Sequence, residues 1–218
     1  MRNFIIVGLG SLGQCLLRSL AARNLQVIVI DRSDDKIQQV RDLATQAIMA
    51  DALNRQLFEE VLPEGMECAI VDLGDQMQAS ILVTNYLAKL KVPEIVVEAV
   101  NAEHAEILKI VGATRVIFPE EEAAERLAGI LAGRGILDFF AVDDEFSMVE
   151  IPVPEAWVNK TVVQLELTRK ARLVLVAIRR GSLQAAGQWR FPDPDAPLEP
   201  NDVLLLAGAA SDVQQLQR

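Results

Sequence analysis

Three glycines near the N-terminus have the spacing of a phosphate-binding loop. Gly8, Gly10 and Gly13 follow the apolar run 4–7 and precede a segment with helical periodicity. In such loops the first glycine permits a tight turn, the second lets phosphate approach the backbone, and the third lets helix and strand pack closely. The amides that begin the helix donate to the phosphate. The sequence therefore predicts a nucleotide site, with a glycine-rich turn that holds no ligand as the alternative.

An acidic residue ends the next expected strand. Asp31 follows the apolar run 27–30, where dinucleotide-binding folds place a carboxylate that accepts hydrogen bonds from ribose hydroxyls. Its negative charge would oppose a 2′-phosphate. We therefore expect a ligand with an unphosphorylated ribose.

Groups for catalysis are harder to assign. The single histidine, His104, lies in a polar segment that begins a helix, and we expect it on the surface. Cys15 follows the glycine loop without an assignable base, and Cys68 fits a small apolar filler. A nucleotide-binding fold without a second reactant site favours sensing over turnover, so we expect no enzymatic activity.

The elements that would position the glycine loop alternate between strands and helices. Apolar runs typical of buried parallel strands lie at 4–7, 27–30, 69–71 and 95–97, with weaker candidates at 47–50 and 116–118. Amphipathic segments separate them. Residues 1–118 are thus expected to form an α/β domain, a Rossmann-like doubly wound parallel sheet.

The pattern changes after Phe118. Pro119 and three glutamates from Glu120 predict a helix start, followed by an apolar stripe that includes Leu127. The apolar segment 136–140 either packs on its own sheet or forms a dimer contact. Residues 119–142 are interpreted as dimerising crossover helices. Residues 143–218 are interpreted as a small α+β domain with strands at 147–153, 173–179 and 203–207 and a helix at 159–169.

Composition excludes several functions. The net charge is −10, which disfavours nucleic acid or anionic lipid as a direct partner. No apolar stretch approaches the roughly 20 residues of a membrane span, so no direct membrane insertion is expected. A cytoplasmic location follows as an expectation.

Several segments together resemble one family. They are GLGSLG at 8–13, Asp31, Asp51-Ala52, and the segments 72–80, 96–101 and 112–120. In this order they resemble the RCK (regulator of potassium conductance) domains of Trk/Ktr-type potassium uptake systems, over essentially the whole chain. The resemblance implies a TrkA-N domain followed by a TrkA-C domain. It also implies a homodimer that assembles into an octameric ring on a membrane potassium-translocating subunit, at the inner face of the membrane, where nucleotide exchange changes the ring's shape.

The resemblance also implies roles for particular residues. An adenine nucleotide (ATP or ADP, with NAD(H) as an alternative) would contact the following residues: Gly8, Gly10, Ser11, Leu12 and Gly13 at the phosphates, Asp31 at the ribose, and Arg32, Asp51, Ala52, Gly74 and Glu98 around the base and cleft. Glu120 would help to bind a divalent cation, Mg²⁺ or Ca²⁺, near the dimer seam, or would only interact with the helix dipole.

Two departures from the family pattern concern the phosphates. Serine at position 11 and glutamate at position 98 stand where relatives often carry basic residues, which weakens the expected preference for a triphosphate. Some relatives also bind cyclic di-AMP between C-terminal domains, and Val162, Val163 and Arg169 fall near those positions. An NAD-dependent oxidoreductase and a free-standing nucleotide sensor remain the alternative functions.

Overall fold

Residues 3–133, 135–143, 145–181 and 187–215 are described by a computed structural model. The chain divides into two units, Met1–Pro119 and Glu120–Arg218. Each unit has its own sheet and its own hydrophobic core.

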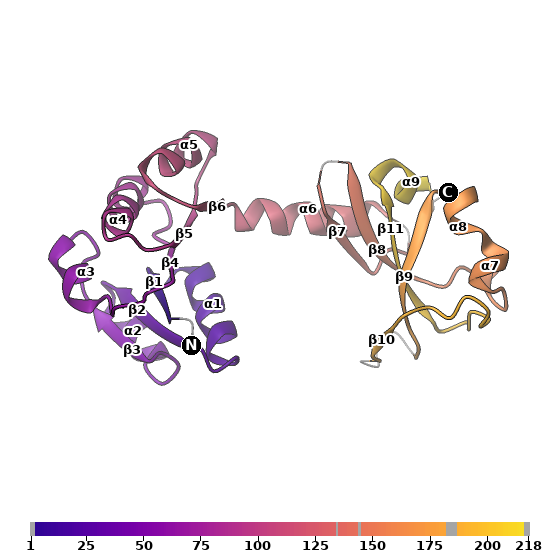
Figure 1. Cartoon of the computed structure of the whole chain (residues 1–218), viewed down its shortest axis with the longest axis horizontal. Coiled ribbons are helices and arrows are strands. Elements are labelled where there is room, and N and C mark those ends of the chain that lie inside the picture. The colour runs from indigo at the N-terminus through magenta and orange to yellow at the C-terminus, as the bar shows by residue number, and fades with distance from the viewer. Residues whose placement is uncertain (1–2, 134, 144, 182–186, 216–218) are drawn as a thin grey trace. The chain divides into compact units, whose positions relative to one another are not determined.

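The first unit is a parallel six-stranded sheet in the order β3-β2-β1-β4-β5-β6 (Figure 1). Its elements alternate along the chain: β1 (Asn3–Val7), α1 (Ser11–Ala21), β2 (Gln26–Asp31), α2 (Asp34–Val40), β3 (Gln46–Met49), α3 (Arg55–Val61), β4 (Cys68–Val71), α4 (Met77–Lys89), β5 (Glu94–Glu98), α5 (Ala102–Val111) and β6 (Arg115–Ile117). The expected doubly wound sheet is confirmed. The strand order reverses between β1 and β4, and this is the topological switch point of such a fold.

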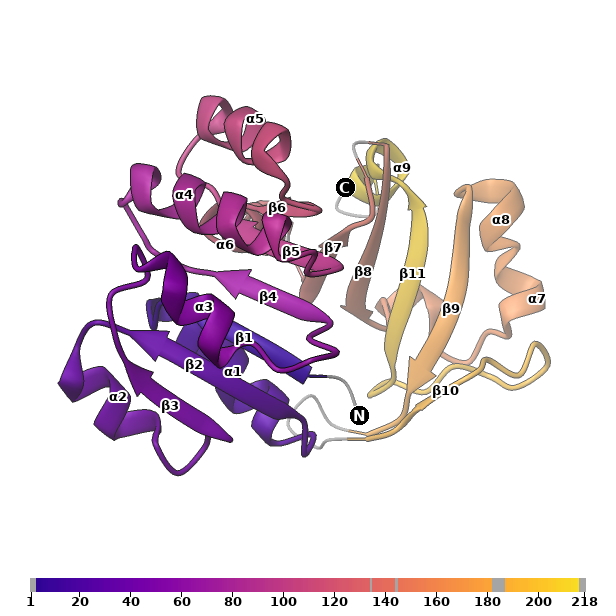
Figure 2. The same ribbon diagram turned by 60° about the vertical axis from the view of Figure 1, so that its left-hand side comes forward.

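Helices lie on both faces of the sheet of the first unit (Figure 2), and apolar side chains on both faces of β1 hold them in place. Ile5 and Val7 belong to a buried cluster with Phe58 of α3 and with residues of α4 and α5. Phe4 and Ile6 belong to a second cluster with residues of α1 and α2. Because side chains alternate across a strand, this continuous apolar strand packs helices on both sides of the sheet.

The second unit is built on an antiparallel sheet in the order β10-β9-β11-β8-β7. Its elements are α6 (Pro119–Ala132), which begins at the last residue of the first unit, β7 (Asp138–Ala141), β8 (Phe146–Pro152), the 3₁₀ turn η1 (Glu155–Trp157), α7 (Val162–Leu165), α8 (Leu167–Lys170), β9 (Leu173–Arg179), β10 (Trp189–Arg190), β11 (Val203–Ala209) and α9 (Ala210–Gln215). The expected α+β character of this part is confirmed.

The segment expected to contain only crossover helices instead holds one helix and one strand. β7 pairs with β8, and Ile136 and Phe139 contribute to the core of the second unit. Helix α6 packs on β7 because Ile130 contacts the same core, and Arg126 Nε donates a 2.8 Å hydrogen bond to Asp138 Oδ1. This hydrogen bond lowers the pKa of the Asp138 carboxyl. Ile136 and Phe139 therefore pack on their own sheet.

The expected single helix at 159–169 is wrong. α7 starts with a capping box between Thr161 and Gln164, but Glu166 adopts a left-handed backbone with φ 47° and ends it. A second short helix, α8, follows. Nothing in the local sequence marks Glu166 as a break, since glycine or asparagine usually occupies such a position.

None of the described helices combines the length and apolar composition needed to cross a membrane.

Candidate nucleotide site

The glycine loop joins β1 to α1 in close contact with the end of β4. Gly8 has φ 94°, and a Cβ there would lie 1.7 Å from the carbonyl oxygen of Asp72. Gly13 is buried, and a Cβ there would lie 2.4 Å from the carbonyl oxygen of Gly8. Both positions therefore require glycine, as the sequence predicts for the turn and for close helix–strand packing.

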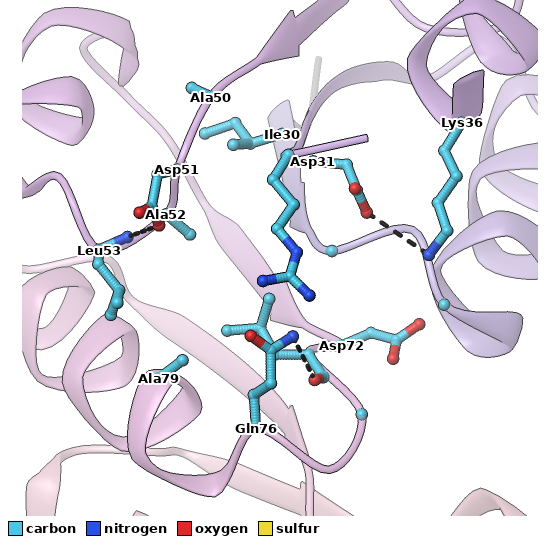
Figure 3. A pocket seen from close by; sticks show the side chains of 15 residues that line it. Ile30, Asp31, Lys36, Ala50, Asp51, Ala52, Leu53, Asp72, Gln76 and Ala79 are labelled. Atoms are coloured by element: carbon cyan, nitrogen blue, oxygen red, sulfur yellow. Dashed lines mark hydrogen bonds and ion pairs between the residues drawn. The ribbon is translucent and has the colours of Figure 1, made fainter. Parts of the chain in front are cut away.

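A pocket of about 240 Å³ opens beside this loop, at the carboxyl ends of the strands around the switch point (Figure 3). Its lining residues are Gly8, Gly10, Ile30, Asp31, Arg32, Lys36, Ala50, Asp51, Ala52, Leu53, Asp72, Leu73, Gly74, Gln76 and Ala79. Open α/β sheets bind ligands at this position. The volume lies below the roughly 300–1,000 Å³ of many ligand sites, so the pocket is small for a whole nucleotide.

Asp31 is held by the loop it faces. Its Oδ2 accepts a 2.7 Å hydrogen bond from the Leu9 amide, and its Oδ1 accepts one of 2.8 Å from the Ser33 amide. Lys36 Nζ lies 3.9 Å from Oδ2, and Figure 3 shows the two side chains pointing toward each other. Each carboxylate oxygen has a second lone pair, which leaves acceptor capacity for ribose hydroxyls.

Asp72 follows β4 and lies under the start of α1. It is 4% exposed, and its Oδ2 accepts a 2.7 Å hydrogen bond from the Gly13 amide. The Gly13 amide at the N-terminus of α1 therefore already donates to a carboxylate. Amides at this position are the donors that a glycine motif is expected to offer to a phosphate.

Most residues expected at the nucleotide line this pocket, and some do not. Those in the lining are Gly8, Gly10, Asp31, Arg32, Asp51, Ala52 and Gly74. Ser11 is exposed and Leu12 half-buried at the start of α1, and neither these two nor Gly13 is part of the lining. Glu98 ends β5, two strands from β1 in the sheet, and also lies outside the lining.

Several lining residues were missed by sequence reasoning. Lys36 belongs to the first turn of α2, Leu53 to the loop after β3, and Gln76 to the loop after β4. Asp72 could have been identified, since it directly follows the expected apolar strand 69–71. The others carry no local signal, because they meet only when the strand ends converge.

The expectation of a surface histidine is wrong. His104 is 0% exposed, and its ring lies between the Val100 amide, which donates to Nδ1 at 3.2 Å, and the Ser80 hydroxyl, 2.8 Å from Nε2. Burial lowers the pKa of His104. The ring does not line the pocket, and its contact with Ser80 links α5 to α4.

Glu120 lies exposed in the first turn of α6. Among the described residues, no cluster of three or more histidine, cysteine, aspartate or glutamate side chains could hold a metal ion. In the C-terminal unit, Val163 is exposed and Arg169 forms a 3.3 Å ion pair with Glu166.

The parallel sheet, the glycine loop and the pocket at the switch point define a Rossmann-like domain. Residues 4–119 match the TrkA-N domain family, and residues 146–218 match the TrkA-C domain family. The chain belongs to the family of TrkA-N/TrkA-C proteins, as its sequence motifs indicate.

Potassium uptake proteins are among its relatives. Ktr system potassium uptake protein C of Bacillus subtilis is 27% identical over 100% of this chain and 96% of that protein. Ktr system potassium uptake protein A of the same organism is 27% identical over 99% of this chain and 96% of that protein.

Solved structures share the fold. The RCK domain of GsuK, 17% identical, matches with a TM-score of 0.67 over 99% of this chain and 47% of that chain. The GsuK channel bound to NAD, 18% identical, has a TM-score of 0.67 over 97% of this chain and 38% of that chain. This chain spans less than half the length of these two solved chains, and the likeness shows the fold alone.

Proposed function

We propose that this chain is a cytoplasmic regulatory subunit that binds an adenine nucleotide and thereby gates a membrane potassium-translocating partner. The observation that carries the proposal is the pocket beside the glycine loop and Asp31. It occurs in a chain that matches Ktr system potassium uptake protein C along its whole length. GsuK channel structures have been solved with NAD and with ADP, which supports an adenine nucleotide as ligand.

The ligand acts here as a signal rather than a coenzyme. Among the described residues, the pocket lining includes no histidine, cysteine or tyrosine. The remaining acid–base candidates are Asp31, which hydrogen-bonds backbone amides, Lys36 beside it, Asp51, whose Oδ1 accepts from the Leu53 amide at 2.9 Å, and Asp72. The three carboxylates already accept hydrogen bonds from backbone amides that shape the loops, which supports a role in binding.

Assembly completes the proposal. The chain would form a homodimer through exposed apolar residues of α6, and dimers would build an octameric ring beneath the membrane partner. Exchange of the nucleotide would change the conformation of the ring and bias the gate of that partner. Glu120 would share a Mg²⁺ or Ca²⁺ ion with a second copy near the dimer seam.

A transport experiment tests the regulatory role. The test uses cells without their own potassium uptake that express a Ktr-type membrane subunit. The subunit is expressed by itself, together with this chain, or together with the Asp31→Asn variant of this chain. We expect uptake to depend on the chain and to lose its nucleotide response in the variant. Equal uptake with and without this chain would contradict a gating role. Oxidation of NADH with small carbonyl substrates by the purified protein would instead support an oxidoreductase.

A further inference from the structure

The charge of the pocket is unusual for a phosphate site. Its lining carries three carboxylates, of Asp31, Asp51 and Asp72, against the two cations Arg32 and Lys36. Lys36 already lies 3.9 Å from the Asp31 carboxylate. Phosphates prefer clefts of positive potential, so the lining as a whole opposes a multiply charged ligand.

The Asp72 carboxylate lies at the N-terminus of α1, beside Gly10. Its Oδ2 receives the Gly13 amide at 2.7 Å, in the first turn of the eleven-residue helix α1. A Cβ at Gly10 would lie 2.5 Å from both carboxylate oxygens of Asp72. The space beside Gly10, which the glycine motif reserves for a phosphate, is therefore adjacent to a buried carboxylate.

The position of Asp72 is fixed rather than adaptable. Its backbone amide donates a 2.8 Å hydrogen bond to the Val7 carbonyl, and its carbonyl oxygen lies so close to Gly8 that no side chain fits there. Moving the carboxylate away would break the bond to the Gly13 amide and leave a buried donor unsatisfied. A phosphate at Gly10 would thus meet a charge that has little freedom to withdraw.

We propose that Asp72 acts as an internal anion in the glycine loop, so that this pocket selects the adenosine part of its ligand and gains little affinity from phosphates. This inference rests on the proposed function and specifies its ligand. Asp72 fulfils at α1 the role of a helix-capping anion. Asp31 remains the ribose acceptor, and the modest volume of the pocket fits a nucleoside.

Binding of adenosine, AMP and ADP to the unmodified protein, measured by isothermal titration calorimetry, gives the first test. We expect their dissociation constants to agree within about threefold. Binding of ADP that is tighter than binding of adenosine by more than this factor would overturn the inference, because the phosphates would then contribute to affinity. The proposed nucleotide binding would stand.

The Asp72→Asn variant gives the second test. Asparagine retains an oxygen that accepts from the Gly13 amide but removes the charge, so we expect ADP to bind at least tenfold tighter, or about 1.4 kcal/mol, while adenosine changes less than twofold. Asp75→Asn is the matched control, because Asp75 is exposed in the same loop and does not line the pocket. Equal or weaker ADP binding in Asp72→Asn would overturn the inference. Absence of binding of adenosine, AMP and ADP to both proteins would instead reject the proposed function and the inference together.

Discussion

The imidazole Nε2 of His104 on α5 lies 2.8 Å from the hydroxyl oxygen of Ser80 on α4. The Val100 amide donates to the opposite ring nitrogen, and the Ser80 hydroxyl donates to the Met77 carbonyl. Nδ1 therefore carries no hydrogen, and Nε2 donates to Ser80. This chain of hydrogen bonds accommodates only the neutral ring, because a second ring proton would point at the Val100 amide.

Acidification is expected to destabilise the first unit through His104. The unfolded histidine titrates near its ordinary pKa of about 6.5, whereas burial lowers the pKa in the folded state. The unfolded state therefore gains a proton first. The contribution of neutral His104 to the free energy of unfolding is fully present above about pH 6.5. It is lost as the pH falls, by at most about 1.4 kcal/mol per pH unit.

Denaturant unfolding at pH 7.5 and pH 5.5 measures this loss. His104 is the only histidine of the chain. The His104→Gln variant therefore has no histidine titration, and it is the reference for the pH dependence of the unmodified protein. We expect the variant to be less stable at pH 7.5 but to lose less stability on acidification than the unmodified protein. Equal losses in both proteins would contradict the prediction.

The burial of His104 illustrates a limit of sequence reasoning. The polar segment 101–106 is typical of an exposed helix start, and Asn101 does cap α5 by accepting from the His104 amide. The ring is nevertheless buried because α5 packs against α4, and a local pattern does not reveal which polar residue finds a partner across that contact. The glycine loop and Asp31, by contrast, depend on neighbouring residues of the chain. They could be predicted with their strand and helix.

The pocket lining shows the same division. Asp31 and the glycines are recognised by spacing. Lys36, Leu53 and Gln76, by contrast, come from helix α2, the loop after β3 and the loop after β4, which converge at the switch point. Similarly, apolar content alone did not decide whether Phe139 packs on its own sheet or on a partner. In the structure Phe139 packs against the core of its own unit.

Asp31→Asn should weaken ligand binding at least tenfold. The substitution removes a charge-assisted acceptor for the ribose, worth roughly 1.5–3 kcal/mol per hydrogen bond, and turns an amide group toward the Leu9 or Ser33 amides. Dissociation constants for adenosine, NADH and NADPH measure the effect, with Asp35→Asn as an exposed control on the same segment. We expect NADPH to bind the unmodified protein more weakly than NADH. Tight NADPH binding would contradict the role of Asp31.

Charged residues on α6 should disrupt assembly. Leu127 and Leu131 are 54% and 75% exposed, whereas Phe139 contacts the core of its own unit and is unsuitable for the test. Burial of each leucine in a dimer would contribute roughly 1.5–3 kcal/mol. The double variant Leu127→Glu, Leu131→Glu should therefore be monomeric in light scattering, and Leu43→Glu, at an exposed apolar residue of the first unit, should not. A fully oligomeric double variant would place the seam elsewhere.

Glu120→Gln should remove a divalent-cation signal from the assembled protein. Mg²⁺ and Ca²⁺ require several oxygen ligands, so one exposed carboxylate binds detectably only when symmetry supplies another. Calorimetry with CaCl₂ and MgCl₂ should give heat with the unmodified protein and with Glu122→Gln, but not with Glu120→Gln. If the signal persists in Glu120→Gln, the carboxylate only complements the helix dipole, a contribution of roughly 0.3–1 kcal/mol.

Gly10 and Asp72 should be energetically coupled. Gly10 has φ −72° and ψ −165°, which alanine adopts readily, so any cost of Gly10→Ala comes from its Cβ approaching the Asp72 carboxylate at 2.5 Å. We expect a loss of about 1–3 kcal/mol, typical of overpacking. The loss should shrink by at least half when Asp72→Ala removes the carboxylate. Denaturant unfolding of the four proteins in a double-mutant cycle measures the coupling. An equal cost of Gly10→Ala in both backgrounds would mean that the Asp72 side chain does not fill the space beside Gly10.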